Sequence, residues 1–182
     1  MVWRKACLIV TMALLFSSSF VFAAQTPSAW NDLFPQNLLD RNGKKVSFDS
    51  LNGKYVGIYF ATQSCPDCGT FSPLLVKFRN EHKDNFEVVF VSVDKNKQAQ
   101  FAYMNEVGMD WLTLEHNSAP ALALNARFEV ASTPTLIVLS PSGELITRDG
   151  CLDIQKTPSE AMTKWEITAT VNQIDLSSFG NF

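Results

Sequence analysis

Histidine is scarce in this chain. Its 182 residues include only His82 and His116, and neither stands at a spacing from a cysteine that is typical of a zinc site. No histidine directly follows the C-x-x-C pair formed by Cys65 and Cys68, which excludes the motif for covalent haem attachment. We therefore expect no metal and no organic cofactor, and we interpret both histidines as solvated surface residues.

An excess of positive charge is also missing. The chain carries 15 Lys and Arg against 18 Asp and Glu, and its formal net charge is −3. A nucleic-acid or anionic-membrane partner would need clustered basic residues, so we expect no nucleic acid among its partners. The sequence has no internal repeat and no low-complexity tract, and its apolar content of 46% suits one folded domain of ordinary size.

The N-terminus has the pattern of a targeting segment. Residues 1–23 combine a short basic start, an apolar run and small residues, as a signal peptide does. We therefore predict a secreted or periplasmic protein with a polar leader over 24–36 and a domain over 37–182. The alternative is an uncleaved membrane anchor, because residues 6–24 are just long enough to span a bilayer, but the serines at 17–19 weaken that interpretation.

Cysteines are too few, and odd in number, for a disulfide-stapled scaffold. Of the four, Cys7 lies in the predicted signal peptide, which leaves Cys65, Cys68 and Cys151. An odd count in an oxidising compartment leaves one thiol unpaired. Two interpretations of Cys151 stay open: a lone, partly buried thiol, or a third redox thiol close to the other two.

Hydrophobic patterning predicts an α/β fold. The apolar runs 54–62 and 86–94 are typical of strands buried on both faces, and a segment with helical periodicity follows each. The other predicted elements are a strand pair around Asn42–Gly43, a helical turn capped by Asp49, helices over 66–80, 98–107, 118–126 and 159–171, and a hairpin over 134–149. This order predicts a mixed central sheet with helices on both faces.

The sequence CPDC follows the first long strand, at the end of the sheet where chemistry gathers. Pro66 suits the first position of a helix, which places Cys65 at the N-cap and Cys68 one turn in. The free N–H groups and the helix dipole stabilise a Cys65 thiolate, so we expect Cys65 to attack and Cys68 to resolve. A structural disulfide remains an alternative, although so short a loop would stabilise the fold little.

The segments YFATQSCPDCGTFSPLLVKF and ARFEVASTPTLIVL resemble the thioredoxin-like superfamily, and more narrowly its tryparedoxin and nucleoredoxin branch. The resemblance covers about residues 38–150 and implies a three-layer thioredoxin-like fold. It also implies that Cys65 and Cys68 are the catalytic pair and redox-active disulfide. Pro134 matches the family's cis-proline, and Thr133 before it would bind substrate through its backbone.

Two positions depart from the pattern of that superfamily. Ser64 stands where the family usually has tryptophan, and Tyr59 stands where thioredoxins proper carry a buried aspartate. The proton acceptor for Cys68 is thereby left open, and Asp94 is the candidate that the sequence offers. Asp67 between the cysteines places negative charge near the thiolate, which favours a reducing pair.

The sequence therefore predicts an exported thiol–disulfide oxidoreductase that reduces protein or small-molecule disulfides. A separate thiol partner would have to donate electrons to the oxidised pair. One alternative is a thiol peroxidase, because Thr62, Cys65 and Pro66 partly match a peroxiredoxin site, although Ile58 replaces the proline of that motif. A further alternative is a binding module that keeps the fold without catalysis.

Overall fold

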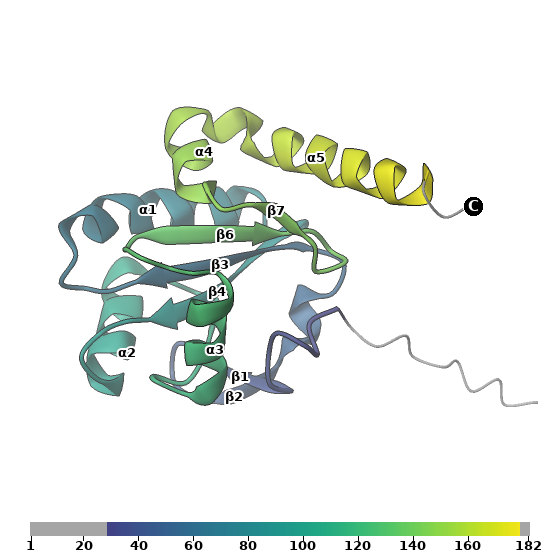
Figure 1. Ribbon diagram of the computed structural model, residues 1–182. Helices are drawn as coiled ribbons and strands as arrows, with labels where there is room; N and C mark the ends of the chain where they lie inside the picture. The colour runs from purple at the N-terminus through teal and green to yellow at the C-terminus, as the bar shows by residue number, and fades with distance from the viewer. Residues whose placement is uncertain (1–28, 179–182) are drawn as a thin grey trace, which may run out of the picture.

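A seven-stranded mixed sheet forms the centre of the molecule (Figure 1). The computed structural model describes residues 29–178, so the predicted signal peptide lies outside the described residues. The strands are β1 (Asn37–Leu39), β2 (Lys45–Ser47), β3 (Tyr55–Ala61), β4 (Phe86–Ser92), β5 (Leu112–Thr113), β6 (Thr135–Leu139) and β7 (Leu145–Thr147). Their order is β2-β1-β5-β4-β3-β6-β7, in which β3, β4 and β5 run parallel and the remaining pairs are antiparallel.

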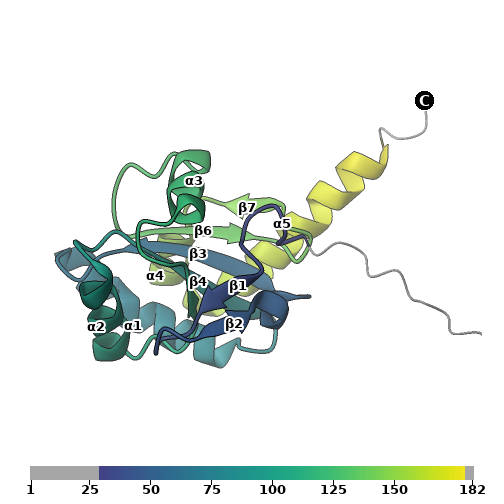
Figure 2. The same ribbon diagram turned by 90° about the horizontal axis from the view of Figure 1, so that it is seen from below.

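Helices cover both faces of this sheet, as Figure 2 shows from below. They are α1 (Pro66–Glu81), α2 (Lys97–Val107), α3 (Ala119–Arg127), α4 (Gly150–Lys156) and α5 (Pro158–Ser178), with a 3₁₀ turn η1 (Phe48–Leu51). α1, α2, α4 and α5 pack on one face, while α3, η1 and the segment before β1 pack on the other. The predicted α/β fold class, with a mixed sheet between two helical layers, is confirmed.

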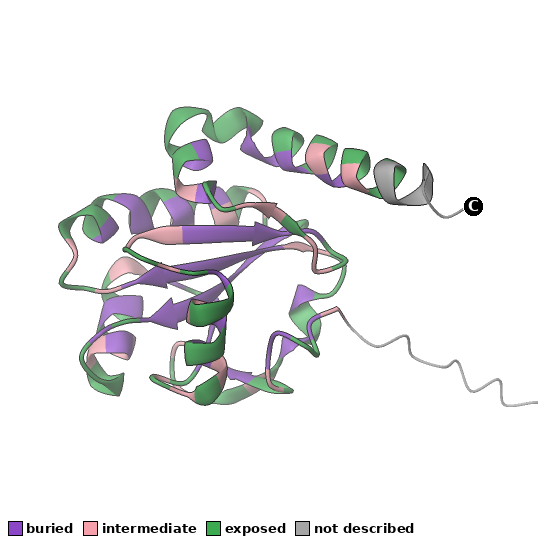
Figure 3. Cartoon of the chain, in the orientation of Figure 1, coloured by how far each residue is buried: buried purple, intermediate pink, exposed green. Residues whose placement is uncertain are grey.

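The two long central strands are buried on both faces because their side chains alternate between two cores. On the α1 side, Phe86 and Phe78 stack edge to face at 5.3 Å, and Trp165 of α5 closes over both. On the opposite side, Ile58 and Phe60 meet the helix and turn of the other layer. Figure 3 shows these strands mostly in purple: β4 is buried throughout, and β3 and β6 are buried after their first residue.

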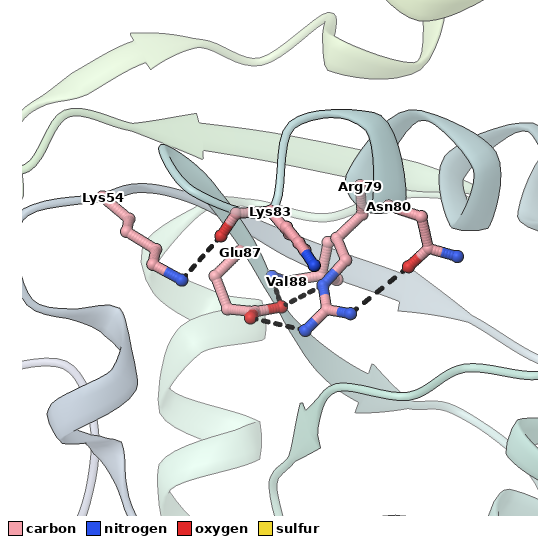
Figure 4. Close-up of polar contacts among 6 residues, drawn as sticks. All are labelled: Lys54, Arg79, Asn80, Lys83, Glu87 and Val88. Atoms are coloured by element: carbon pink, nitrogen blue, oxygen red, sulfur yellow. Dashed lines mark hydrogen bonds and ion pairs between the residues drawn. The ribbon is translucent and has the colours of Figure 1, made fainter.

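An ion pair fixes the C-terminal end of α1 to β4 (Figure 4). Arg79 donates two hydrogen bonds to the Glu87 carboxylate, at 2.8 and 2.7 Å, and one Glu87 oxygen also accepts the Val88 N–H at 2.9 Å. The Glu87 side chain is only 7% exposed, so its charge depends on this fork-like contact with Arg79. The helix that begins at the CPDC sequence is therefore anchored at its far end.

The sequence predicts that residues 24–36 form a polar leader outside the domain. For the residues of this segment that the structure describes, that prediction is wrong. From residue 29 onward this segment packs into the core, and Trp30, Leu33 and Phe34 are buried. Their spacing of three and four residues puts them on one side of a turn, which Leu33 and Phe34 close by donating backbone hydrogen bonds to Trp30. The packed body thus starts before the predicted domain boundary at residue 37.

Four local points also need correction. The helix α4 was not predicted, and α5 extends beyond the predicted end at residue 171. The 3₁₀ turn is capped by Ser47 rather than Asp49. The two histidines are half-buried rather than solvated: the ring of His82 lies 4.5 Å from that of Phe78, and His116 contacts the backbone of the loop after β4. Within the described residues, no helix combines the length and apolar character needed to cross a membrane.

Candidate active site

The turn between β3 and α1 presents Cys65 as the N-cap of the helix, as the sequence predicts. Cys65 has extended backbone angles of φ −89° and ψ 116°, and Pro66 occupies the first helical turn. The backbone N–H of Cys68 donates to Cys65 Sγ at 3.2 Å. Cys65 is half-buried and Cys68 is fully buried, and both carry free thiols in this structure. The two sulfurs therefore share one helical turn but differ in access to solvent.

Their surroundings separate the pKa values of the two thiols. Burial acts to raise the pKa of Cys65, but hydrogen bonds from Cys68, Thr133 and the backbone N–H of Asp67 outweigh it and lower that pKa. Burial, the hydrogen bond to Cys65 and the charge of Cys65 together raise the pKa of Cys68 to about 11. At neutral pH Cys65 is therefore the more nucleophilic thiol of the pair, and Cys68 is protonated.

The second part of the site comes from a segment far away in the sequence. The peptide bond between Thr133 and Pro134 is cis, as the resemblance predicts. The carbonyl oxygen of Thr133 lies 3.4 Å from Cys65 Sγ and accepts a hydrogen bond from it in the thiol form. The segment directly before β6 thus brings the Thr133 carbonyl against Cys65, and Pro134 lines a groove together with Asp67.

A buried chain of hydroxyl groups occupies the position of the missing aspartate. Tyr59 Oη lies 2.6 Å from Ser72 Oγ, which lies 2.7 Å from Tyr103 Oη, and all three residues are buried. Burial raises the pKa of both tyrosines, and the charge of Cys68 adds to the effect. These groups are neutral hydrogen-bonding partners at physiological pH rather than a carboxylate.

Sequence reasoning missed Ser72 and Tyr103. The signal for Ser72 was its helical phase, since it lies four residues after Cys68 and so faces the same core. The position of Tyr103 on α2 follows only from tertiary packing.

Among the described residues, no hydrogen bond joins the Asp94 carboxylate to Cys68, so its role as proton acceptor stays a prediction. Its carboxylate accepts hydrogen bonds from Thr62, Gln63 and Ser92. These contacts tie it to the loop in front of Cys65 rather than to Cys68. Within residues 29–178, no group of three His, Cys, Asp or Glu side chains is arranged to hold a metal ion.

An open groove of about 440 Å³ runs beside the cysteine pair. Its lining comes from the first turn of α1, the start of β6 and α4, and includes Asp67, Pro134, Arg148, Cys151 and Leu152. Cys151 is half-buried, and burial, with added charge effects from its neighbours, raises its pKa to about 12. The structure thus places the odd cysteine in the wall of the groove, as a protonated thiol at neutral pH.

The geometry agrees with comparisons to known proteins. The family model described as "Thioredoxin-like" matches residues 52–145. The chain belongs to the thioredoxin-like family. It is 34% identical to human nucleoredoxin over 132 residues, which are 70% of this chain and 30% of nucleoredoxin. The chain therefore spans only about a third of the length of that relative.

The matches to solved structures cover nearly the whole of the other chain, unlike the match to nucleoredoxin. Tryparedoxin from Trypanosoma brucei is 33% identical, and the match covers 76% of this chain and 98% of that one with a TM-score of 0.68. Tryparedoxin II complexed with glutathionylspermidine is 29% identical, covers 73% and 95% of the two chains and gives a TM-score of 0.66. These matches place the thioredoxin-like domain in the tryparedoxin and nucleoredoxin branch.

Proposed function

We propose that this chain is an exported thiol–disulfide oxidoreductase that reduces protein or small-molecule disulfides. The observation that carries the proposal is the asymmetry of the cysteine pair. Cys65 is accessible with a lowered pKa, while Cys68 is buried with a pKa raised to about 11. Such a pair has one thiol poised to attack and a second held back until it is needed.

The reaction proceeds by two displacements. The Cys65 thiolate attacks one sulfur of a substrate disulfide, so the substrate S–S bond breaks, a mixed disulfide forms on Cys65 and the first substrate thiolate leaves and takes up a proton. Cys68 then loses its proton and attacks Cys65 Sγ, which forms the Cys65–Cys68 disulfide and releases the second substrate thiol. Two electrons pass to the substrate, and a partner dithiol must return two to the pair.

The substrate is proposed to lie along the groove beside Pro134. The backbone of Thr133, which is half-buried and lies two residues before β6, can pair with an extended segment in the manner of an added strand. The solved complex of tryparedoxin II with glutathionylspermidine supports a small thiol compound as one substrate class. The reducing direction is proposed from the sequence, because the Asp67 carboxylate adds negative charge in the first turn of α1, next to the pair. The backbone N–H of the same residue acts the other way and lowers the pKa of Cys65.

Turnover of a model disulfide tests this function. The purified protein, with dithiothreitol as electron donor, is expected to accelerate the reduction of insulin disulfides. Cys65→Ser is expected to abolish the acceleration, while Asp110→Ala, which changes a side chain that is 76% exposed and lies outside the groove lining, should retain it and serves as the control. Equal activity of the parent and Cys65→Ser would contradict the proposal.

Export is a separate part of the proposal and rests on residues 1–23. In intact cells that express the full chain, the protein is expected to be cleaved near residue 23 and to be found outside the cytoplasm. Detection of only the uncleaved chain in the cytoplasm would refute export and leave the thiol chemistry untouched.

A further inference from the structure

The carboxylate of Asp94 is buried directly after β4, where 7% of the residue is exposed. Oδ1 accepts from Thr62 Oγ1 at 2.8 Å and from the Gln63 N–H at 2.9 Å, and Oδ2 accepts from Ser92 Oγ at 2.7 Å. In the part of the chain that the structure describes, Asp94 takes part in no ion pair. Its charge is therefore stabilised by neutral donors, whose geometry it fixes in return.

Two of these three donors belong to the short loop that delivers Cys65. The Thr62 carbonyl accepts the Cys65 N–H at 3.2 Å, and Thr62 Oγ1 lies 3.2 Å from Ser64 Oγ. Asp94 Oδ1 thus holds Thr62, and the Thr62 carbonyl in turn holds the backbone of Cys65. The Val93 N–H also donates to Ala61 at 3.0 Å, which keeps the ends of the two parallel strands together at this point.

We propose that Asp94 is a positioning residue for disulfide exchange, which holds the Thr62–Ser64 loop so that Cys65 Sγ meets the helix N–H groups and the Thr133 carbonyl. This inference rests on the proposed oxidoreductase function. Cys65 Sγ has hydrogen-bond partners at 3.2 and 3.4 Å, and a displacement of the loop would change both distances. Loss of the Asp94 contacts would misplace the nucleophile without touching either cysteine.

The side chain acts through hydrogen-bond acceptance rather than through its charge. The pKa of Cys65 is set by burial and by hydrogen bonds from Cys68, Thr133 and Asp67, and Asp94 is not among these causes. An asparagine at this position keeps an oxygen for Thr62 and Gln63, but it loses the charge and replaces the oxygen that accepts from Ser92 with an amide N–H₂ group. If Asp94 acts by positioning the loop, the Ala variant should lose more activity than the Asn variant. If it acts through its charge, the two variants should lose the same amount.

The test compares Asp94→Ala, Asp94→Asn and the parent, with Asp110→Ala as the matched removal of an exposed carboxylate whose side chain is 76% exposed. The readouts are insulin reduction and the pH midpoint of Cys65 alkylation, with circular dichroism to confirm folding. We expect Asp94→Ala to reduce turnover about 10- to 100-fold, the range for a displaced reacting group, and to raise the alkylation midpoint. Asp94→Asn should stay within about threefold of the parent, because it preserves the oxygen that accepts from Thr62 and Gln63.

Parent values for a folded Asp94→Ala would overturn the proposal, as would equal losses in the Ala and Asn variants. If Asp94→Ala does not fold, Thr62→Val provides the test, because it removes one of the two contacts between Asp94 and the loop. It should lower turnover and raise the alkylation midpoint, each by less than the change expected for Asp94→Ala. Parent values for a folded Thr62→Val would then overturn it. The alkylation midpoint needs no turnover, so a parent protein that reduces no disulfide would refute the oxidoreductase function separately.

Discussion

At the scale of single residues, Cys65 and Cys68 differ in accessibility and in hydrogen bonding rather than in chemical type. The helix N-terminus supplies N–H groups to Cys65, whereas Cys68 points into the core that contains the buried tyrosines. The same thiol chemistry is thereby divided between an attacking and a resolving sulfur. The Ser64 and Tyr59 departures leave this division intact, because neither residue supplies the contacts that create it.

Cys68→Ser should trap the mixed disulfide on Cys65. The first displacement needs only the Cys65 thiolate, while the second needs the missing sulfur, so the adduct has no internal route of release. Incubation with a peptide disulfide followed by mass mapping should find a near-stoichiometric adduct on Cys65. In Cys65→Ser, the buried and protonated Cys68 should form the adduct at least about tenfold more slowly. Equal adduct formation in the two variants would contradict the assigned roles.

At the scale of elements, α1 is the part that carries the site. Its N-terminus is shaped by Cys65 and Pro66, and its C-terminal turn is held to β4 by the Arg79–Glu87 pair. The helix that carries the cysteine pair is therefore tied to the sheet at the end opposite the site.

Arg79→Ala should lower the free energy of unfolding by about 3–5 kcal/mol, because it leaves the buried Glu87 carboxylate without its partner. Lys77→Ala removes the exposed, 3.9 Å pair with Glu81 on the same helix and should change stability by about 0.5 kcal/mol or less. Urea unfolding of the three proteins measures both values. Equal, small effects of the two substitutions would show that the Arg79–Glu87 contact is not structural.

The elements that the sequence predicts well are those with strong local signals. β3, β4, α1 and α2 have long apolar or periodic runs, and Gly108 ends α2 in the left-handed conformation that favours glycine. α4 has no side-chain cap at Asp149 and is only seven residues long. Its stability comes from tertiary contacts, including the hydrogen bond of 2.9 Å from Trp165 Nε1 to Asp153, and those are invisible in a local pattern.

The site divides in the same way. The N-cap position of Cys65 and the burial of Cys68 follow from the CPDC sequence and from the strand that precedes it. The approach of Thr133 and Pro134 joins segments 68 residues apart, and only the family resemblance indicated it. The roles of Ser72 and Asp94 depend on the register of packed elements, so the sequence named Asp94 but not its contacts.

At the scale of the whole molecule, the core on the α1 side of the sheet buries several groups in their neutral form. Cys68 and Cys151 pack against the same core and both have raised pKa values, as do Tyr59 and Tyr103. Folding of the reduced protein is therefore linked to protonation at alkaline pH.

The reduced protein should lose stability as the pH rises above about 9. Thiols in the unfolded chain ionise near their ordinary value of 9.0, whereas Cys68 and Cys151 in the folded protein keep their protons to about 11 and 12. Between pH 9 and these values the unfolded state binds fewer protons than the folded state. The stability that the two thiols contribute is therefore complete below pH 9 and is lost as the pH rises through their folded-state pKa values. Urea unfolding of the parent and Cys151→Ala at pH 8, 9.5 and 11 measures the effect. A fall of the same size in both proteins would show that Cys151 does not contribute.

The division of labour between Cys65 and Cys68 is tested most directly by alkylation of the reduced protein over a range of pH, with the modified residue identified by mass mapping. Cys65 should react first, with a midpoint below the ordinary thiol value of 9.0, while Cys68 and Cys151 stay unmodified until much higher pH. Modification of Cys68 before Cys65, or of both with the same midpoint, would contradict the account.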